Sequence, residues 1–348
     1  MISPTLSLLL PEISTPSYIC GVHCLGIILL STLHKQPPHM TALFSDNDVS
    51  PVEKLLKLEQ LDVDLFKSAE PLYMARGARG LYGGNVISQS FMAAIQTVPV
   101  EYKVHSMHCY FVLAGDPTLP VLYKVEHVRD GHSFATRTVQ ARQRGRCIFT
   151  TTISFQIAAE AKLSHQPNYF GASLPQPDDL PDYAATVGEL YKKGYIAKGE
   201  LMSAEQLSSV VPMDTRIVMN EYPDGTPPDQ KKNYLWVRAK GKIKNEQAHA
   251  MALAYISDNA LLGTSARVNG VNAQDIAMMV SLDHSIYFHA PFKADEWMLF
   301  QMNSPWTGSG RGLVLGNIFT QDGILAASII QEGVIRFSDL LAKSKPKL

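Results

Sequence analysis

Gln331 and Asp258 are the two polar residues whose positions first suggest a reactive site. Three apolar residues precede Gln331 at a spacing of two: Leu325, Ala327 and Ile329. In a β-strand the Gln331 amide therefore lies on their apolar face, where it either pairs with another polar group or bonds neighbouring backbone, because an unpaired buried amide costs roughly 1–3 kcal/mol. Asp258 ends an apolar, helix-like segment, where the helix dipole opposes a carboxylate by typically ~0.3–1 kcal/mol. Asp258 is thus either a base that is retained despite this loss of stability, or a polar residue that simply ends the helix.

Histidine is the other candidate for acid–base chemistry, since its unperturbed pKa lies close to neutral pH. His284 and His289 occur in one stretch, and His284 directly follows Asp283. His284 falls on the apolar face of the expected strand, so we interpret it as a hydrogen-bonded core histidine, and His108 likewise. An Asp283–His284 pair would suit a lyase, but adjacent strand residues face opposite ways.

The chain contains two versions of one pattern. Residues 104–112 and 280–288 are similar β-like segments, in which His108 and His284 align at a separation of 176 (284 − 108). Each follows a helix-like segment, at 84–97 and at about 246–259, and each precedes strands joined at glycine turns, around Gly145 and Gly323. We infer a duplication of class α+β, in which each half is one helix followed by several antiparallel strands.

The second β-like segment alternates in polarity, which predicts one continuous strand with two distinct faces. One face is expected to carry Met278, Val280, Leu282, Ile286 and Phe288, and the other Met279, Ser281, Asp283, Ser285, Tyr287 and His289.

Proline density predicts the boundary between the halves. Residues 158–186 contain Pro167, Pro175, Pro177 and Pro181, which disrupt regular structure. We therefore expect a linker at 158–186 between an N-terminal domain at 49–157 and a C-terminal domain at 187–338. Ser50, Pro51 and Glu53 form the pattern of a capping box that opens the first helix.

The two ends differ from the rest of the chain. Residues 1–48 are expected to be a leader or a disordered extension, with Met40 a credible second start and 1–39 an extension of the gene prediction. The apolar run at 18–33 is interrupted by His23 and is short for a membrane span, so no stable span is expected. The tail, 339–348, ends in Pro-Lys-Leu, which is similar to the Ser-Lys-Leu type of peroxisomal address.

Composition excludes several functions. The 31 Lys and Arg against 32 Asp and Glu give a net charge of −1, so nucleic acid is not an expected partner. No G-x-S-x-G elbow, H-E-x-x-H or paired C-x-x-C occurs, so neither a serine hydrolase of the α/β type nor a metal site is indicated. Cys20 and Cys24 lie outside the region that looks folded, so no disulfide framework is implied. We expect no cofactor.

One dense basic cluster remains. Arg142, Arg144 and Arg146 flank Gly145. We favour a solvated hairpin tip over the alternative, a contact for a polyphosphate ligand.

In the order and spacing of its motifs the chain resembles the type II acyl-CoA thioesterase family, and within it the fungal peroxisomal members most closely. The matching pieces span about residues 50 to 337 and include Tyr82–Ser90, Val104–Phe111, Arg129–Phe134, Ser154–Gln156, Tyr255–Asp258, Ser281–Ser285, Phe288-His289 and Gln331–Gly333. The resemblance implies a tandem double hotdog, with each antiparallel sheet wrapped around one helix. It also implies a catalytic trio of Asp, Ser or Thr, and Gln, carried here by Asp258, Ser281 and Gln331.

The resemblance implies hydrolysis of fatty acyl-CoA to free acid and CoA by an activated water, with acyl-CoA as partner. A hotdog lyase of the enoyl-CoA hydratase type and a thioesterase of specialised metabolism remain alternatives. Together with the C-terminal tail, the resemblance indicates a peroxisomal protein that an import receptor binds, with the cytoplasm as the alternative location. The resemblance also implies a homo-oligomer.

Overall fold

The computed structural model describes residues 49–69, 72, 74, 80–193, 211–271 and 275–338. The predicted leader, 1–48, and the predicted tail, 339–348, lie outside them. The first half contains α1 (Pro51–Leu56), β1 (Leu58–Asp62), β2 (Leu65–Ser68), α2 (Gly83–Ile95), β3 (Tyr102–Phe111), β4 (Leu122–Asp130), β5 (Phe134–Gln143) and β6 (Arg146–Ile157).

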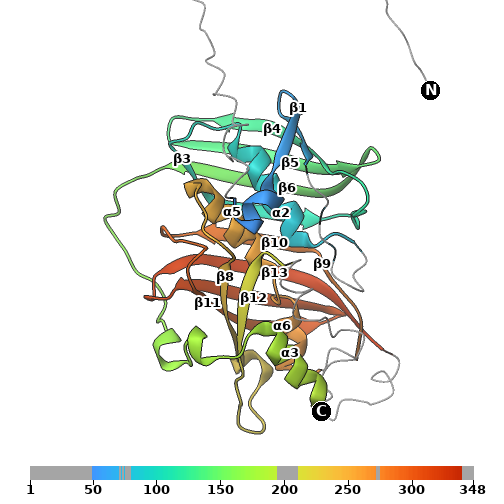
Figure 1. Ribbon diagram of the computed structural model, residues 1–348, viewed down its shortest axis with the longest axis vertical. Helices are drawn as coiled ribbons and strands as arrows, with labels where there is room; N and C mark the ends of the chain where they lie inside the picture. Colours follow the sequence, from blue (N-terminus) through green and yellow to red (C-terminus); the bar gives the residue numbers. More distant parts are fainter. Residues whose placement is uncertain are drawn as a thin grey trace, which may run out of the picture. The chain divides into compact units, whose positions relative to one another are not determined.

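The second half follows with the same plan and some additions (Figure 1). Its elements are η2 (Gly171–Ser173), η3 (Pro177–Asp179), α3 (Tyr183–Lys192), β7 (Met213–Val218), η5 (Pro228–Gln230), β8 (Lys232–Ala239), α5 (Glu246–Ser257), α6 (Gly263–Val268), β9 (Ile276–Ser281), β10 (Asp283–Phe288), β11 (Met298–Gly308), β12 (Arg311–Thr320) and β13 (Leu325–Phe337).

One antiparallel sheet of 13 strands joins the described parts of both halves. Its order is β1-β2-β4-β5-β6-β3-β10-β13-β12-β11-β8-β7, with β9 paired to β13 beside this path. The halves meet where β3 pairs with β10, with Cys109 opposite His284 and Met107 opposite Ile286. In Figure 1 the blue-to-green strands of the first half and the orange-to-red strands of the second half enclose α2 and α5. The double hotdog predicted from the resemblance is confirmed.

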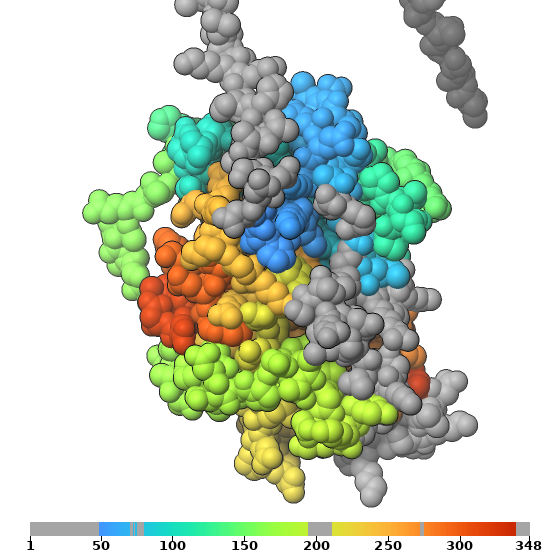
Figure 2. Space-filling model, in the orientation of Figure 1, coloured from blue at the N-terminus to red at the C-terminus, as the bar shows by residue number. Residues whose placement is uncertain are grey.

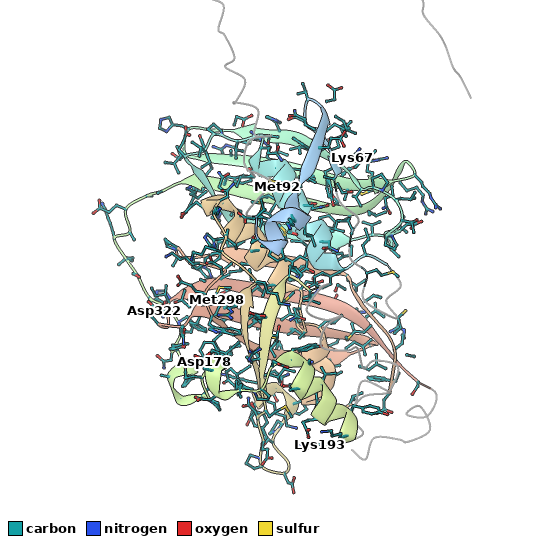
Figure 3. The ribbon with its side chains drawn as sticks, in the orientation of Figure 1. Lys67, Met92, Asp178, Lys193, Met298 and Asp322 are labelled. Atoms are coloured by element: carbon teal, nitrogen blue, oxygen red, sulfur yellow. The ribbon has the colours of Figure 1, made fainter. Side chains whose placement is uncertain are left out.

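Helices α2 and α5 form the centre of the core. Every residue of α2 from Gly84 to Ile95 is buried, and these include the polar Asn85, Ser88, Gln89 and Ser90. Met92 of α2, labelled in Figure 3, is 2% exposed and belongs to the same buried cluster as Leu253 of α5 and Ile286 of β10. The buried Gln89 is satisfied, since it donates to the Leu55 carbonyl and accepts from the Tyr123 hydroxyl. One core therefore spans both halves and fixes the two helices together.

Glu53 ties the first helix of the chain to the start of α5. The capping box at Ser50 is confirmed, because Glu53 Oε2 accepts from the backbone N–H and the hydroxyl of Ser50. Glu53 Oε1 accepts from the backbone N–H groups of Lys244 and Asn245, at 3.1 and 3.3 Å. A carboxylate is favourable at a helix N-terminus, so Glu53 helps to anchor α5.

The segment predicted as a linker is extended only in its first part. Residues 161–168 are exposed, and Figure 2 shows this green segment at the left edge of the view. From Gln166 onward the segment contacts the second half: Gln166 bonds the backbone of Gly323 and Leu325, and the Pro175 carbonyl accepts from the Trp236 indole. Helix α3 begins at Tyr183, before the expected end at 186. The domain boundaries stay predictions.

The predicted continuous strand at 278–289 is wrong, because it divides at Leu282. Ser281 of β9 lies opposite Gly333 of β13, whereas Ser285 of β10 lies opposite Ile330, so the register shifts by one residue between them. Such a bulge exchanges the two faces of a strand. Ser281 therefore shares the inner face with Ile286, and not the outer face on which the alternation placed it.

The prediction for His108 is also wrong. His108 is exposed, and its Nδ1 bonds the Ser285 hydroxyl on the outer face of the sheet. A register shift between Val104 and Ser106 explains the error, since it turns Met107 and Cys109 inward.

Among the described helices, none combines the length and apolarity that a membrane span requires.

Candidate active site

Asp258 lies where the ends of the two central helices meet. It is the C-cap of α5, and its Oδ2 accepts a 3.1 Å hydrogen bond from the backbone N–H of Gly84, in the first turn of α2. The C-terminus of α5 disfavours a negative charge, whereas the N-terminus of α2 favours one. The second half thus supplies the carboxylate, and the first half supplies the helix end that offsets its unfavourable position.

Two glycines allow this close approach. A Cβ at Gly83 would lie 2.7 Å from Asp258 Oδ2 and 2.8 Å from the Phe111 ring, and a Cβ at Gly84 would lie 2.5 Å from the Tyr255 carbonyl. Tyr82, just before them, donates its hydroxyl to the same carbonyl at 2.9 Å and packs edge-on against the Tyr255 ring. The Tyr82-Gly83-Gly84 segment therefore holds α2 against the end of α5.

Gln331 joins the other two residues of the predicted trio. It lies in β13 with 0% exposure, on the face of Ala327 and Ile329, as its period of two predicts. Its Nε2 donates to Asp258 Oδ1 at 2.9 Å and to the Ser281 hydroxyl at 2.7 Å. The orientation of the amide follows from these partners, since its oxygen would repel the carboxylate. Gln331 Oε1 is buried and has no partner among the described residues, so it can accept from a ligand or water.

Ser281 reaches Gln331 because of the bulge at Leu282. The last residue of β9 lies opposite Gly333, and Gln331 is two residues from Gly333 on the same face of β13. The Leu282 N–H bonds Glu332 of β13, and its carbonyl accepts from Phe111 of β3, so the bulge is held on both sides. Since Ser281 Oγ accepts from Gln331, its own O–H remains available to donate.

Burial sets the protonation of the carboxylate. It raises the pKa of Asp258 to about 6, against the lowering effect of the hydrogen bonds from Gln331 and Gly84. A carboxylate with this pKa is mostly ionised at neutral pH and is a stronger base than an exposed one. Asp258 can therefore accept a proton in the pH range of most cytoplasmic and organellar enzymes.

His284 is a core residue, as predicted. It is 0% exposed, and its Nε2 lies 2.9 Å from Ser257 Oγ, which itself donates to the Ala254 carbonyl. Nε2 therefore carries the proton of a neutral ring, and burial lowers the pKa of His284 to about 3. Burial likewise raises the pKa of the Cys109 thiol well above its usual range. Neither group is suited to attack a substrate.

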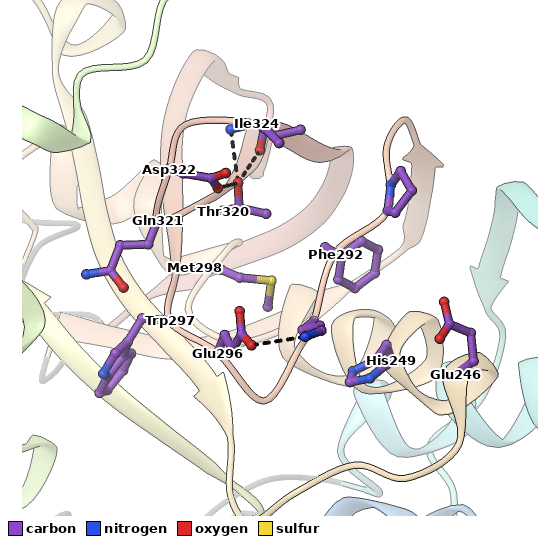
Figure 4. A pocket seen from close by; sticks show the side chains of 12 residues that line it. Glu246, His249, Phe292, Glu296, Trp297, Met298, Thr320, Gln321, Asp322 and Ile324 are labelled. Atoms are coloured by element: carbon purple, nitrogen blue, oxygen red, sulfur yellow. Dashed lines mark hydrogen bonds and ion pairs between the residues drawn. The ribbon is translucent and has the colours of Figure 1, made fainter.

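The first half has no carboxylate at the position that corresponds to Asp258. The C-cap of α2, which corresponds to Asp258 of α5, is Gln96. At that end of the molecule a cavity of about 430 Å³ lies beside the start of α5, lined by residues that include Glu246, His249 and Asp322 (Figure 4). None of the trio lines this cavity, so the candidate site at Asp258 rests on its hydrogen bonds and not on cavity size. Within the described parts of the chain, no cluster of three or more His, Cys, Asp or Glu could hold a metal.

The resemblance named all three residues of the trio, but Gly84 was not identified from the sequence as a partner of Asp258. The Gly83-Gly84 pair at the start of a helix was the available signal, because a helix that begins with two glycines permits a close backbone contact and presents free N–H groups.

Two families of known domains match the chain. Residues 71–156 match the acyl-CoA thioesterase N-terminal domain, and residues 178–335 match the acyl-CoA thioesterase C-terminal domain. The mouse protein named acyl-coenzyme A thioesterase 8 is 40% identical over 302 residues, covering 84% of this chain and 91% of that protein. Acyl-CoA thioesterase 2 of Haemophilus influenzae is 34% identical over 292 residues, covering 82% and 96%.

A yeast protein and a solved structure extend the comparison. Peroxisomal acyl-coenzyme A thioester hydrolase 1 of Saccharomyces cerevisiae is 27% identical over 349 residues, covering 85% of this chain and 98% of that protein. The crystal structure of an acyl-CoA thioesterase II from Mycobacterium marinum superimposes with a TM-score of 0.66 at 35% identity, covering 82% and 98%.

Substitution of Gly84 tests the contact between the helix ends. In Gly84→Ala the new methyl group overlaps the Tyr255 carbonyl, so we expect a loss of about 1–3 kcal/mol in the free energy of unfolding. Chemical denaturation measures it. Gly188→Ala is the control: a Cβ there meets nothing within 4 Å, and alanine favours helix α3, so stability should hold or rise. Equal stability of Gly84→Ala and the parent would contradict a close approach at this point.

Proposed function

The chain belongs to the type II acyl-CoA thioesterase family and hydrolyses acyl-CoA thioesters, and from this premise we propose that Asp258, Ser281 and Gln331 are its catalytic residues. The observation that carries the proposal is the Gln331 Nε2 atom, which donates to both Asp258 and Ser281. One buried amide thereby orients a base and a hydroxyl with respect to each other. Pre-set geometry of this kind contributes to rate because no reorganisation is needed during the reaction.

In the proposed reaction, Asp258 accepts a proton from a water molecule as the water oxygen attacks the thioester carbonyl. Gln331 Oε1, which lacks a partner among the described residues, and the Ser281 hydroxyl orient that water. The tetrahedral intermediate then expels the CoA thiolate, and the C–S bond breaks. The protonated Asp258 returns the proton to the leaving sulfur, which restores the carboxylate.

The direction of the second proton transfer follows from the two acidities. A thiol has a pKa near 8.5, whereas burial raises the pKa of Asp258 to about 6, so the proton moves downhill from the carboxylic acid to the thiolate. The same group can therefore act as base and then as acid at neutral pH.

The geometry does not favour the lyase alternative. Asp283 and His284 are adjacent in β10: Asp283 Oδ1 accepts from the Glu332 N–H, whereas His284 points inward to Ser257. An Asp–His pair that shares one substrate would need both side chains on one side of the strand.

For its cellular site we propose the peroxisome, reached by recognition of the C-terminal Pro-Lys-Leu by the import receptor. A yeast relative that carries peroxisomal in its name supports this proposal. We also propose a homo-oligomer, for which the exposed Tyr110 and Tyr287 on the outer face of the sheet offer apolar surface. The mass of the purified protein in solution tests this, and a monomer would exclude it.

The trio is tested by two substitutions. Asp258→Asn removes the base, and Gln331→Ala removes the group that orients it, so each should lower kcat for a fatty acyl-CoA by roughly tenfold or more. Release of CoA is followed with a thiol reagent, and circular dichroism checks the fold. His284→Ala separates the alternative, because loss of hydrolysis in that variant alone, with normal stability, would instead indicate a histidine base. Unchanged rates in both trio variants would defeat the assignment.

The pH dependence follows from the ionised form of Asp258. Because the carboxylate must be unprotonated to accept a proton, kcat/KM should fall about tenfold per pH unit below about 6 and be level above about 7. Initial rates between pH 4.5 and 8 measure this. The residual activity of Asp258→Asn should lack the acidic limb, and a limb that persists there would assign the titration to another group.

The localisation is tested by removing the last three residues. The full-length protein fused at its N-terminus to a fluorescent protein should enter peroxisomes, and the truncated form should stay in the cytoplasm. Peroxisomal import of both forms, or of neither, would contradict the proposed role of Pro-Lys-Leu.

A further inference from the structure

The arginine cluster predicted at a hairpin tip lies at the end of the molecule that holds Asp258. Arg144 and Gly145 form the tight turn between β5 and β6, with φ of 50° and 73°. Arg144 is 74% exposed and pairs with Asp116 at 3.1 Å, and the exposed Arg146 side chain has no hydrogen bond or ion pair to any described residue. Three arginines against one carboxylate leave the tip with excess positive charge.

The tip is connected to the active site through the loop between β3 and β4. Gln143 holds this loop, since its amide bonds the backbone N–H and carbonyl of Asp116, at 2.8 and 2.9 Å. The next residue back, Gly115, accepts a 3.1 Å hydrogen bond from the Leu81 N–H. Leu81 stands three residues before Gly84, so the Gly115 carbonyl lies no more than about 17 Å from the Asp258 carboxylate.

The opposite end of the molecule serves as an internal comparison. The duplication makes the turn at Asp322-Gly323 the counterpart of the turn at Arg144-Gly145, since each joins the last two strands of its half. There the start of α5, the loop before β11 and the turn line the cavity of Figure 4, with Glu246, Glu296 and Asp322 against Lys293. Figure 3 labels Asp322 at the left of the second-half sheet. The acidic turn is thus on the side where α2 ends at Gln96, and the basic turn is on the side where α5 ends at Asp258.

We propose that Arg142, Arg144 and Arg146 form the subsite that binds the phosphate groups of coenzyme A. Guanidinium groups bind phosphate in two-pronged fashion and keep their charge at any physiological pH. The pantetheine arm, which separates the thioester from the diphosphate, is about as long as an extended tetra- or pentapeptide, roughly 13–18 Å. The Gly115 carbonyl, one residue before the Asp116 that pairs with Arg144, lies within this reach of Asp258, so an acyl-CoA with its thioester at Asp258 directs its phosphates to the side of the molecule that bears this tip. The subsite rests on the proposed position of the chemistry at Asp258.

The Asp116–Arg144 pair fits such a subsite. The pair is exposed on the Arg144 side, so exchange of the carboxylate for a phosphate costs little. Arg142 is less exposed, and it donates to the Gly145 carbonyl and to Gln140, which fixes the shape of the turn. Arg144 and Arg146 are therefore the residues to substitute, because neither holds the turn together.

The decisive experiment compares two thioesters of the same acid, one with the phosphates and one without the phosphates, the adenosine and the pantoyl part of the arm. Decanoyl-CoA carries them, and the decanoyl thioester of N-acetylcysteamine does not. In the double variant Arg144→Gln and Arg146→Gln, KM for decanoyl-CoA should rise about threefold to tenfold, the range of two exposed charge contacts, with kcat unchanged. KM for the short thioester should not change. Added salt should raise KM for decanoyl-CoA less in the variant than in the parent.

Two controls keep the test decisive. Arg129→Gln removes one positive charge, half of what the double variant removes, at an exposed site near the other end of β4, and it should leave both KM values unchanged. Binding of CoA, measured by calorimetry in Asp258→Asn with and without the two arginine substitutions, reports the subsite without turnover, and its Kd should rise by the same factor. An equal Kd, together with an equal ratio of the two KM values, would overturn the subsite. Full turnover by Asp258→Asn would overturn the proposed base and leave the comparison of Kd values valid.

Discussion

A half-buried carboxylate between two helix ends is the constraint on which this structure depends. Asp258 is costly where it stands, because it meets the negative end of its own helix and loses water. The Gly84 N–H at the start of α2 and the Gln331 amide offset part of that cost. Both partners come from elements other than α5, so the carboxylate is stable only in the assembled pair of halves. The core that α2 and α5 share, and the sheet that continues through β3 and β10, hold the two halves in that assembly.

The bulge at Leu282 is the second feature on which the site depends. It turns both Ser281 and His284 inward, whereas a regular strand would place them on opposite faces. Ser281 and His284 are three residues apart, so alternation alone would put them on opposite faces. With the register shifted, Ser281 contacts Gln331 while His284 contacts Ser257, the residue before Asp258. The two inward contacts act on the hydroxyl of the site and on the last turn of α5. A bulge beside an active site commonly re-aims a side chain in this way.

Sequence reasoning succeeded where a pattern is local and failed where register decides. The two central helices were predicted within about two residues, because apolar periodicity and the segment composition mark them, and Gln331 was placed inward by its period of two. His108 and the faces of 278–289 were wrong for one reason: a bulge adds one residue and exchanges the faces without any composition signal. Ser281 was named by resemblance alone, and Gly84 was missed because its role arises from the packing of a distant helix.

The duplication explains why the molecule needs two halves for one site. In a pair of identical halves, each helix start would face the other helix end, which would make two equivalent sites. Here the end of α5 is Asp258 and the end of α2 is Gln96, while the first-half turn bears arginines and the second-half turn bears Asp322. The two ends of the molecule therefore differ in both respects: the end with the proposed base also has the arginine turn, and the other end has neither. The first half is then more than a scaffold: it supplies the Gly84 N–H that bonds the Asp258 carboxylate of the second half.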